Sequence, residues 1–430
     1  MTRDATLFER HRAVTPSWLA TYYEQPIELT HGDGRVVWDA DGNRYLDFFG
    51  GILTTMVGHG VPEVVEALQA QAATMLHTST LYLSRPMVEL AERLAELSGI
   101  PDAKVFLTTS GTEANEAALL AATAHRRSNQ VLALRNSYHG RSFGTIAITA
   151  NRSWSPTSLS GLQVSFVHGG YRLRSPFRAL DDEAYTTACV QDLRDVLDMC
   201  TSGDVACMIA EPIQGVGGFA TPPDGLFGAF AEVLGERGIL FIADEVQTGF
   251  GRTGEHLWGH QAHGFTPDLV TVAKGIGNGV SLGAVIGRAE VIDAVPANSI
   301  STFGGNPLSC VGALATLDVL LRDDLQGNAL KRGAQLAEGL HALAARHDWI
   351  AEVRGKGLML AIEVCRPGGI DPWNEAAAQL MEATRERGLL VGKGGLYGNV
   401  IRITPPLTVT EAEVAEALQL LGDATEEVGR

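Results

Sequence analysis

GILFIADEVQTGFGRTG, residues 238–254, places two adjacent carboxylates at the end of an apolar run. The run 239–243 has the length and composition of a buried strand, and Asp244 and Glu245 follow it directly. Because ionised acids are almost never buried without partners, we expect a cationic group at the carboxyl end of this strand.

Apolar runs of strand length recur along the chain, at 104–108, 131–135, 206–210, 239–243, 269–273 and 283–287. Helical patterns lie between several of them, and others precede the first, as at 62–76 and 86–97, each with a proline at its start. Near-continuous apolar strands joined by helices indicate a mostly parallel sheet covered by helices on both faces. The sequence therefore predicts an α/β fold.

The pattern changes after about residue 310. It predicts one long helix over 309–345, then strands that include 357–364 and 399–403, and helices over 374–388 and 410–421. Near the N-terminus, 32–48 reads as a hairpin that turns at Asp41-Gly42. We therefore divide the chain into an N-terminal segment 1–55 that joins a small α+β domain, a large domain 56–310, and the C-terminal small domain 311–430.

Composition restricts the partners. The 430 residues carry a net charge of −17, which argues against nucleic acid or an anionic membrane as a ligand. No apolar stretch approaches the roughly 20 residues needed to cross a bilayer, and the N-terminus does not resemble a secretory signal. The five cysteines are scattered and show no metal-ligand spacing, so we expect no metal site and a cytoplasmic location.

In open α/β sheets, ligands bind beyond the carboxyl ends of the strands. Ser110, Gly111 and Thr112 follow strand 104–108 and open a helix, where free N–H groups and hydroxyls form a cup for a phosphate. An ordinary helix cap is the alternative. Tyr138 and Arg141 follow strand 131–135, where they could stack on a ring and hold a carboxylate, or be plain surface residues.

Two further strand ends complete the pattern. Glu211 follows strand 206–210, and Lys274 follows strand 269–273 as the cation that the carboxylates require. A phosphate cup, an aromatic face, a strand-end acid and a strand-end lysine are together what pyridoxal 5'-phosphate needs. The lysine forms a Schiff base with its aldehyde, and Asp244 keeps its ring nitrogen protonated.

The motifs resemble those of the class III (omega) aminotransferases, which are pyridoxal-phosphate enzymes of fold type I, the aspartate aminotransferase-like fold. The similarity runs from about residue 20 to 421. Its motifs, in chain order, are SGTEANEAA (110–118), YHGR (138–141), EPIQGVGG (211–218), FIADEVQTGFGRTG (241–254), the stretch from PDLVTVAKGIGNG (267–279), STFGGNP (301–307) and IRITPPL (401–407).

This resemblance implies roles for individual residues. Lys274 would be the Schiff-base lysine and proton shuttle, and Asp244 would bind the ring nitrogen. The other cofactor contacts would be Ser110, Gly111 and Thr112 at the phosphate, Tyr138 and Val246 on the two ring faces, Gln247 at the ring hydroxyl, and Thr302 from a neighbouring subunit. The last role implies a homodimer with shared active sites. Glu245 would be structural, satisfied by backbone groups or by an arginine such as Arg252.

Amino acids and 2-oxo acids are the substrates that the resemblance implies, in a ping-pong reaction. Arg402 would grip the carboxylate beside the reacting carbon. With an omega-amino acid, Glu211 would neutralise Arg402, and Arg141 would hold the distal carboxylate. Beta-alanine with pyruvate, alanine with glyoxylate, 4-aminobutyrate with 2-oxoglutarate, and acylated ornithine all remain open.

Other activities use the same scaffold. A racemase, an aminomutase or a decarboxylase would keep Lys274 and Asp244 but would need no second substrate. A dinucleotide-binding oxidoreductase is disfavoured, because no G-x-G-x-x-G opens a helix after the first strand. A binding protein that had lost catalysis would be expected to lack Lys274.

Overall fold

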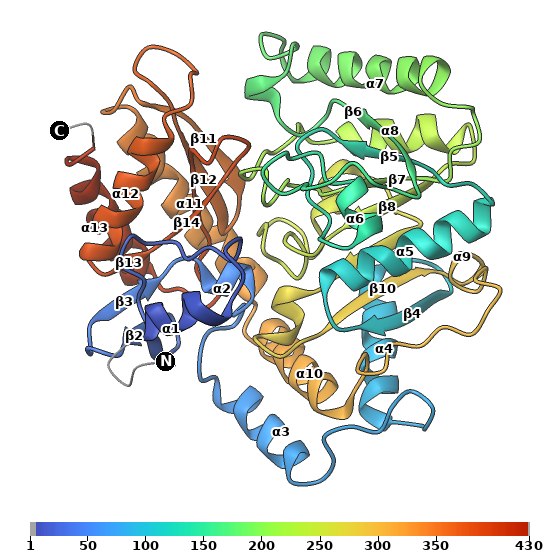
Figure 1. Ribbon diagram of the computed structural model, residues 1–430, viewed down its shortest axis with the longest axis horizontal. Coiled ribbons are helices and arrows are strands. Elements are labelled where there is room, and N and C mark those ends of the chain that lie inside the picture. The colour runs from blue at the N-terminus through green and yellow to red at the C-terminus, as the bar shows by residue number, and fades with distance from the viewer. Residues whose placement is uncertain (1–5, 429–430) are drawn as a thin grey trace.

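The computed structural model describes residues 6–428, and its larger part is built on a seven-stranded sheet (Figure 1). The strand order is β4-β10-β9-β8-β7-β5-β6. Only β10 runs antiparallel to its neighbours, so the expected mostly parallel sheet is confirmed. The strands are β4 (Ala103–Thr108), β5 (Gln130–Leu134), β6 (Gln163–Val167), β7 (Cys207–Ala210), β8 (Leu240–Asp244), β9 (Leu269–Val272) and β10 (Gly283–Arg288).

Helices cover both faces of this sheet, as its apolar strands predict. In β5, Leu132 and Leu134 pack in one cluster with α7 (Asp182–Met199) and α8 (Leu226–Gly235). Val131 and Ala133 pack in another cluster, with α5 (Gly111–Arg126). Successive side chains of a strand point to opposite faces, so a strand buried on both faces must be apolar at every position. The six predicted strands are all present.

The smaller part is built on two sheets, with helices packed against them. One antiparallel sheet has the order β11-β12-β15-β14, and α11, α12 and α13 pack against it or against each other. In the other sheet, β13 pairs in parallel with β3, which brings N-terminal and C-terminal segments together. The bounds are β1 (Leu29–Asp33), β2 (Val36–Asp39), β3 (Arg44–Asp47), β11 (Ile350–Lys356), β12 (Met359–Val364), β13 (Leu389–Leu390), β14 (Gly392–Gly394), β15 (Val400–Ile403), α11 (Leu325–Ala344), α12 (Asn374–Glu386) and α13 (Glu411–Thr425).

The predicted turn at Asp41-Gly42 is confirmed, because it joins the antiparallel strands β2 and β3. The remaining helices are α1 (Leu7–Val14), α2 (Gly50–Leu53), α3 (Pro62–Ala72), α4 (Arg85–Ser98), α6 (Phe143–Ala147), α9 (Ala289–Ile292) and α10 (Pro307–Arg322). Within residues 6–428, no helix combines the length and apolar character that a membrane span requires.

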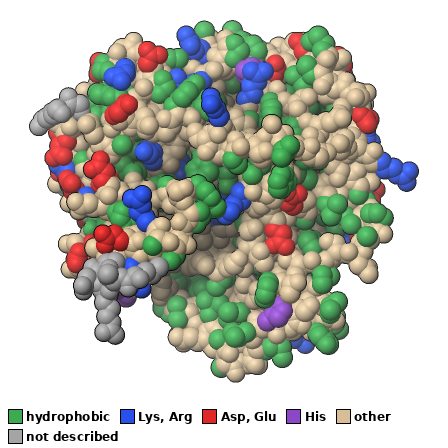
Figure 2. Space-filling view, in the orientation of Figure 1, with side chains coloured by type: hydrophobic (Ala, Val, Ile, Leu, Met, Phe, Trp, Pro, Cys, Tyr) green, Lys and Arg blue, Asp and Glu red, His purple; other side chains and the backbone are tan. Residues whose placement is uncertain are grey.

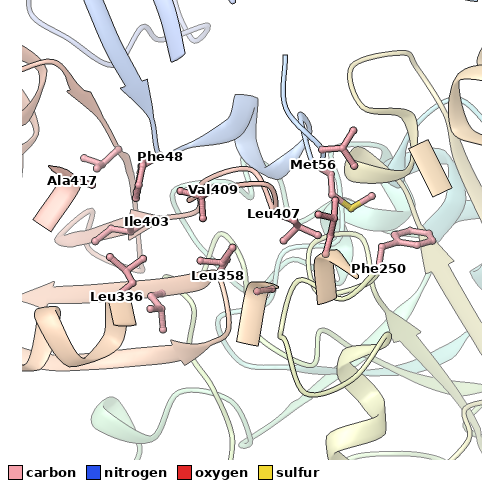
Figure 3. Close-up of a cluster of buried hydrophobic side chains, with 14 of the residues drawn as sticks. Phe48, Met56, Phe250, Leu336, Leu358, Ile403, Leu407, Val409 and Ala417 are labelled. Carbon is pink, nitrogen blue, oxygen red and sulfur yellow. The ribbon is translucent and has the colours of Figure 1, made fainter. Parts of the chain in front are cut away.

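One continuous apolar core joins the two parts. Figure 3 shows Leu336 and Ala417, from helices of the smaller part, in the same cluster as Met56 and Phe250 near the large sheet. Leu407 lies between the two groups in this view. Burial of this shared surface opposes separation of the two parts, since apolar burial contributes roughly 25 cal/mol per Å². The edge of the large sheet is thereby held against the smaller part.

The single helix predicted over 309–345 is wrong. The chain forms α10 and α11 instead, and the break lies at Asp323 and Asp324. Asp324 has φ +48°, in the left-handed region, and its carboxylate accepts a hydrogen bond from the N–H of Gly327 at 3.1 Å. Apolar spacing continues through the break, so only the cap chemistry of an aspartate marks it.

We predict that Asp324→Ala lowers the free energy of unfolding by about 1–2 kcal/mol, because it removes the helix cap and leaves alanine in a left-handed conformation. Asp324→Asn is the matched control, since asparagine tolerates this conformation and can cap the helix. Urea denaturation of the cofactor-free protein measures both. Equal loss in the two variants would contradict this account of the break.

Candidate active site

Asp244 ends β8 at the carboxyl edge of the large sheet and is only 4% exposed. Its Oδ2 accepts hydrogen bonds from Asn115 Nδ2 at 2.8 Å and from His139 Nδ1 at 2.7 Å. Its Oδ1 accepts from the N–H of Val246 at 3.1 Å. Three elements of the large part therefore fix this carboxylate, and its second oxygen has room for a further donor.

Lys274 follows β9 and opens the short turn η3 (Lys274–Gly277). Its φ of +48° is uncommon for a residue with a side chain, and such strain concentrates at functional sites. Burial lowers the pKa of Lys274, opposed by Asp244 and Glu211 and assisted by Arg402. A lysine with a lowered pKa is more often the neutral amine that can attack an aldehyde.

Lys274, expected as a cation at the ends of these strands, lines the same cavity as Asp244, which opposes the lowering of its pKa. No ion pair joins Lys274 to Asp244 or Glu245. Glu245 Oε1 accepts from the N–H and the Nδ1 of His260, at 2.7 and 2.8 Å, and Oε2 accepts from the N–H of Gly259 at 2.9 Å. These bonds outweigh burial and lower the pKa of Glu245.

Arg252, the arginine suggested for Glu245, lies elsewhere. Its Nη1 donates to the carbonyl oxygen of Pro405 at 2.6 Å and to that of Leu358 at 3.3 Å. The backbone alternative for Glu245 is therefore confirmed and the arginine alternative is not. Burial without a carboxylate partner lowers the pKa of Arg252 to about 9.

The phosphate cup is predicted at the start of α5, where Ser110 acts as a helix cap. Ser110 is the N-cap and its hydroxyl accepts from the N–H of Glu113 at 3.2 Å, while Gly111 and Thr112 are the first helical residues. The first N–H groups of any helix lack carbonyl partners inside it. A Cβ on Gly111 would lie 3.1 Å from Val246 Cγ1, so the backbone and the valine are already in close contact.

Glu211 follows β7 and is buried. Its Oε1 accepts from the N–H of Tyr138 at 2.9 Å, and its Oε2 accepts from the N–H of Gly215 at 2.7 Å. Burial raises the pKa of Glu211 to about 7, with His139 lowering it and Asp244 raising it. This carboxyl therefore changes charge near neutral pH, unlike an exposed glutamate.

Arg402 in β15 of the smaller part is 4% exposed and does not line the cavity described below, but its charge lowers the pKa of Lys274. Its Nη2 donates to the carbonyl oxygen of Lys393 at 3.1 Å and to the hydroxyl of Tyr22 at 3.3 Å, and Nη1 reaches the carbonyl oxygen of Gly215 at 3.4 Å. Its Nε has no partner among the described residues. Arg402 and Glu211, which are expected to pair when an omega-amino acid is bound, do not contact each other directly. Both contact Gly215.

Of three other predicted residues, one lines the cavity and two lie outside its lining. Tyr138 is half-buried and lines the cavity, with the ring of Trp154 edge-on at 5.6 Å. Arg141 is exposed, lies outside the cavity lining, and stacks over Trp18 with 5.5 Å between guanidinium carbon and ring. Thr302 is also exposed and does not line the cavity of its own chain.

A cavity of about 330 Å³ collects most of these groups. Its lining includes Ser110, Gly111, Thr112, Tyr138, Glu211, Asp244, Val246, Gln247 and Lys274. Among residues 6–428, the buried Gln247 Oε1 and His139 Nε2 lack hydrogen-bond partners, which is costly unless a ligand satisfies them. Phosphate donors, a partnered acid, a lysine and an orphaned amide oxygen fit pyridoxal phosphate.

Several residues at this site were not assigned a role from the sequence. Asn115 and His139 orient Asp244, and Tyr22 contacts Arg402. Asn115 and His139 fall inside the quoted motifs, so their position was available, but the contact was not. Tyr22 and Arg402 are 380 positions apart, and no local pattern could join them.

Comparison with known proteins agrees with this site. The chain matches the family Aminotransferase class-III over residues 19–425. It is 40% identical over 415 residues to alanine–glyoxylate aminotransferase 2 homolog 2, mitochondrial, of Arabidopsis thaliana, covering 95% of this chain and 84% of that protein. It is 36% identical to an acetylornithine aminotransferase of Methanothermobacter thermautotrophicus, covering 94% and 95%.

A solved structure gives the same result. The PLP-bound amine transaminase from an uncultivated Pseudomonas species superposes with a TM-score of 0.90 at 31% identity, covering 96% of this chain and 98% of that one. The fold type I architecture is thereby confirmed. The chain belongs to the class III aminotransferases. It is a pyridoxal-phosphate enzyme that moves an amino group from an amino acid to a 2-oxo acid.

Proposed function

We propose that Lys274 and Asp244 carry the chemistry of this transamination. Pyridoxal phosphate supplies an aldehyde that joins amino groups and a ring that stores an electron pair. Lys274 Nζ would hold it covalently at rest and, once released, would move the proton of the substrate carbon that bears nitrogen. The observation that supports this most directly is that Lys274, with its lowered pKa, lines one cavity with Asp244, whose carboxylate is held by hydrogen bonds.

The cofactor would lie between the start of α5 and β8. Ser110, Gly111 and Thr112 would hold the phosphate through helix N–H groups and hydroxyls, as helix starts commonly do. Tyr138 and Val246 would contact the two ring faces, and Gln247 would reach the ring hydroxyl. The orphaned amide oxygen of Gln247 supports this last contact.

Arg402 would bind the carboxylate beside the reacting carbon. Its unpartnered Nε and the effect of its charge on Lys274 support this. The gate would be Glu211, whose carboxylate accepts from the N–H of Gly215 while the carbonyl of Gly215 accepts from Arg402. If Glu211 turned away from Gly215, it could neutralise Arg402, and Arg141 at the rim would then hold a distal carboxylate.

The amino donor would be an omega- or beta-amino acid or alanine, and the acceptor pyruvate, glyoxylate or 2-oxoglutarate. The names of the relatives support this range, because alanine, glyoxylate and acetylornithine appear among them. We place the enzyme in the cytoplasm. We also keep the division into 1–55, 56–310 and 311–430.

We further propose a homodimer in which Thr302 of each chain contacts the phosphate in the other. Leu81, Tyr82 and Leu83 are 73%, 71% and 100% exposed, and Phe303 beside Thr302 is 61% exposed. Figure 2 shows hydrophobic side chains on the lobe at the bottom of the view, where Figure 1 places α3. Clustered exposed apolar side chains mark protein interfaces, and the occupant that completes the site is a second copy.

We predict that the purified enzyme transfers amino groups only when both a donor and a 2-oxo acid are present. Lys274→Ala should reduce the rate by about 10²-fold or more, because a general base contributes 10²–10⁴-fold. A panel of amines against the three acceptors measures this. Conversion of the amino acid without any 2-oxo acid would instead indicate a racemase, an aminomutase or a decarboxylase.

Glu211 gives a second prediction. As pH rises through about 7, Glu211 loses its proton and places a negative charge near Arg402, so the KM for the 2-oxo acid should rise. In Glu211→Gln the side chain stays neutral, and this rise should disappear. The same variant should slow the half-reaction with the amine donor more than the half-reaction with the 2-oxo acid; equal slowing would contradict the gate.

The interface gives a third prediction. Leu83→Glu should convert the dimer to monomers and lower activity by at least tenfold, because a charge would be buried between the subunits and the partner's threonine would be lost. Met199→Glu is the control, since Met199 is also strongly exposed, at 73%, but lies on α7. Sedimentation velocity measures both. A fully active monomer would refute the shared site.

A further inference from the structure

A fully buried carboxylate outside the active-site cavity is surrounded by cationic groups. Glu363 lies in β12 and has no exposed surface. Its Oε1 accepts from Arg174 Nη2 at 2.6 Å and Nε at 3.1 Å. Its Oε2 accepts from the hydroxyl of Tyr171 and from Arg354 Nη1, each at 2.6 Å.

The charges in this cluster balance each other. Burial would raise the pKa of Glu363, but Arg354, Tyr171 and Arg174 outweigh burial and lower it. Arg354 also pairs with Glu352. A buried ion pair seldom adds net stability over an apolar core of the same volume, so its value more often lies in fixing one arrangement.

The cluster joins the two parts of the molecule. Tyr171 and Arg174 belong to the segment that follows β6 of the large sheet, whereas Arg354 and Glu363 lie in β11 and β12 of the smaller part. Each side chain that contacts Glu363 from the large part therefore holds the small sheet in one position. Because the contacts are charge-assisted and multiple, they are directional as well as strong.

The same cluster reaches the substrate side of the active site by two routes. Arg354 Nε donates to the carbonyl oxygen of Gly218 at 2.7 Å, and Gly218 ends the turn that begins at Glu211 and contains Gly215. In the small sheet, Ala361 pairs with Arg402, so Glu363, two positions on, lies on the same face as Arg402.

Gly218, on the first route, is tightly packed against the small sheet. A Cβ on Gly218 would lie 3.0 Å from Gly395 Cα and 3.0 Å from Val400 Cγ2, so the turn is pressed against the small sheet. Gly215, three residues earlier in the same turn, contacts the guanidinium of Arg402. A displacement of Gly218 would therefore also move Gly215, which contacts Arg402.

We infer that Glu363 is a positioning residue for carboxylate recognition: through Arg354 and Gly218 it holds the turn 211–218 against β15, and so fixes the orientation of Arg402. This inference rests on the proposed role of Arg402 as the carboxylate-binding residue. It concerns only the substrate side of the site, because the phosphate cup and Asp244 are held by α5 and the strands of the large sheet.

Glu363→Gln tests this, since glutamine keeps the size but removes the charge that orients two arginines. We expect the KM for the best 2-oxo acid to rise about tenfold, while kcat stays within twofold and the visible cofactor band is unchanged. A KM raised less than threefold, with kcat or the cofactor band reduced, would show a merely structural role and overturn the inference.

A second variant keeps the test decisive if Glu363→Gln does not fold. Arg354→Lys keeps a positive charge beside Glu363, but a lysine cannot reach Glu363 and the Gly218 carbonyl as one planar fork does. The same rise in KM is expected. Glu416→Gln, which breaks the exposed pair with Arg44, is the control and should leave KM and kcat unchanged.

Arg402→Lys, measured in parallel, separates two kinds of failure. An unchanged KM in Arg402→Lys would contradict the proposed role of Arg402 itself. A raised KM in Arg402→Lys together with an unchanged KM in both Glu363→Gln and Arg354→Lys would contradict only the positioning role of Glu363.

Discussion

The hydrogen bonds to the buried carboxylate of Asp244 are the interaction on which the rest of the site depends. A carboxylate can be kept inside a protein only if donors replace the water that it loses. Here α5 supplies Asn115, the loop after β5 supplies His139, and the turn after β8 supplies a backbone N–H. These three elements must therefore meet at one edge of the sheet, and the cavity is the space that they enclose.

The two adjacent acids, Asp244 and Glu245, have different roles, as the contacts of Glu245 show. Its oxygens are fully used by His260, Gly259 and Thr248, so it holds the following turn and cannot act on a ligand. Asp244 keeps capacity for one more donor on the cavity side. Adjacent carboxylates with the same side-chain chemistry thus differ in role because their partners differ.

The smaller part supplies Arg402, the arginine proposed to bind the substrate carboxylate. Its strand β15 brings Arg402 close enough for its charge to lower the pKa of Lys274, and the shared apolar core, Arg252 and the Glu363 cluster hold that strand in place. Glu211 and Arg402 approach from opposite sides of Gly215. In the proposed gate, recognition of two substrates that differ in charge would depend on a small movement of Glu211 rather than on two separate pockets.

The sequence predicted the strands with mostly apolar runs, together with the strand-end residues Asp244 and Lys274. It did not predict β6, in which polar Gln163 and Ser165 interrupt the apolar run at the edge of the sheet. The individual residues that contact Glu245 and Arg252 were not identified from the sequence, for another reason. They are backbone groups and a histidine from distant turns, and only the folded chain brings them together.

Mass spectrometry of the borohydride-reduced holoenzyme is the most direct test of the central claim. Reduction makes the bond between lysine and cofactor permanent, so a digest shows which lysine was attached. We expect one modified peptide, and we expect it to carry the cofactor on Lys274. Unmodified Lys274 in protein saturated with cofactor would contradict the account of this site.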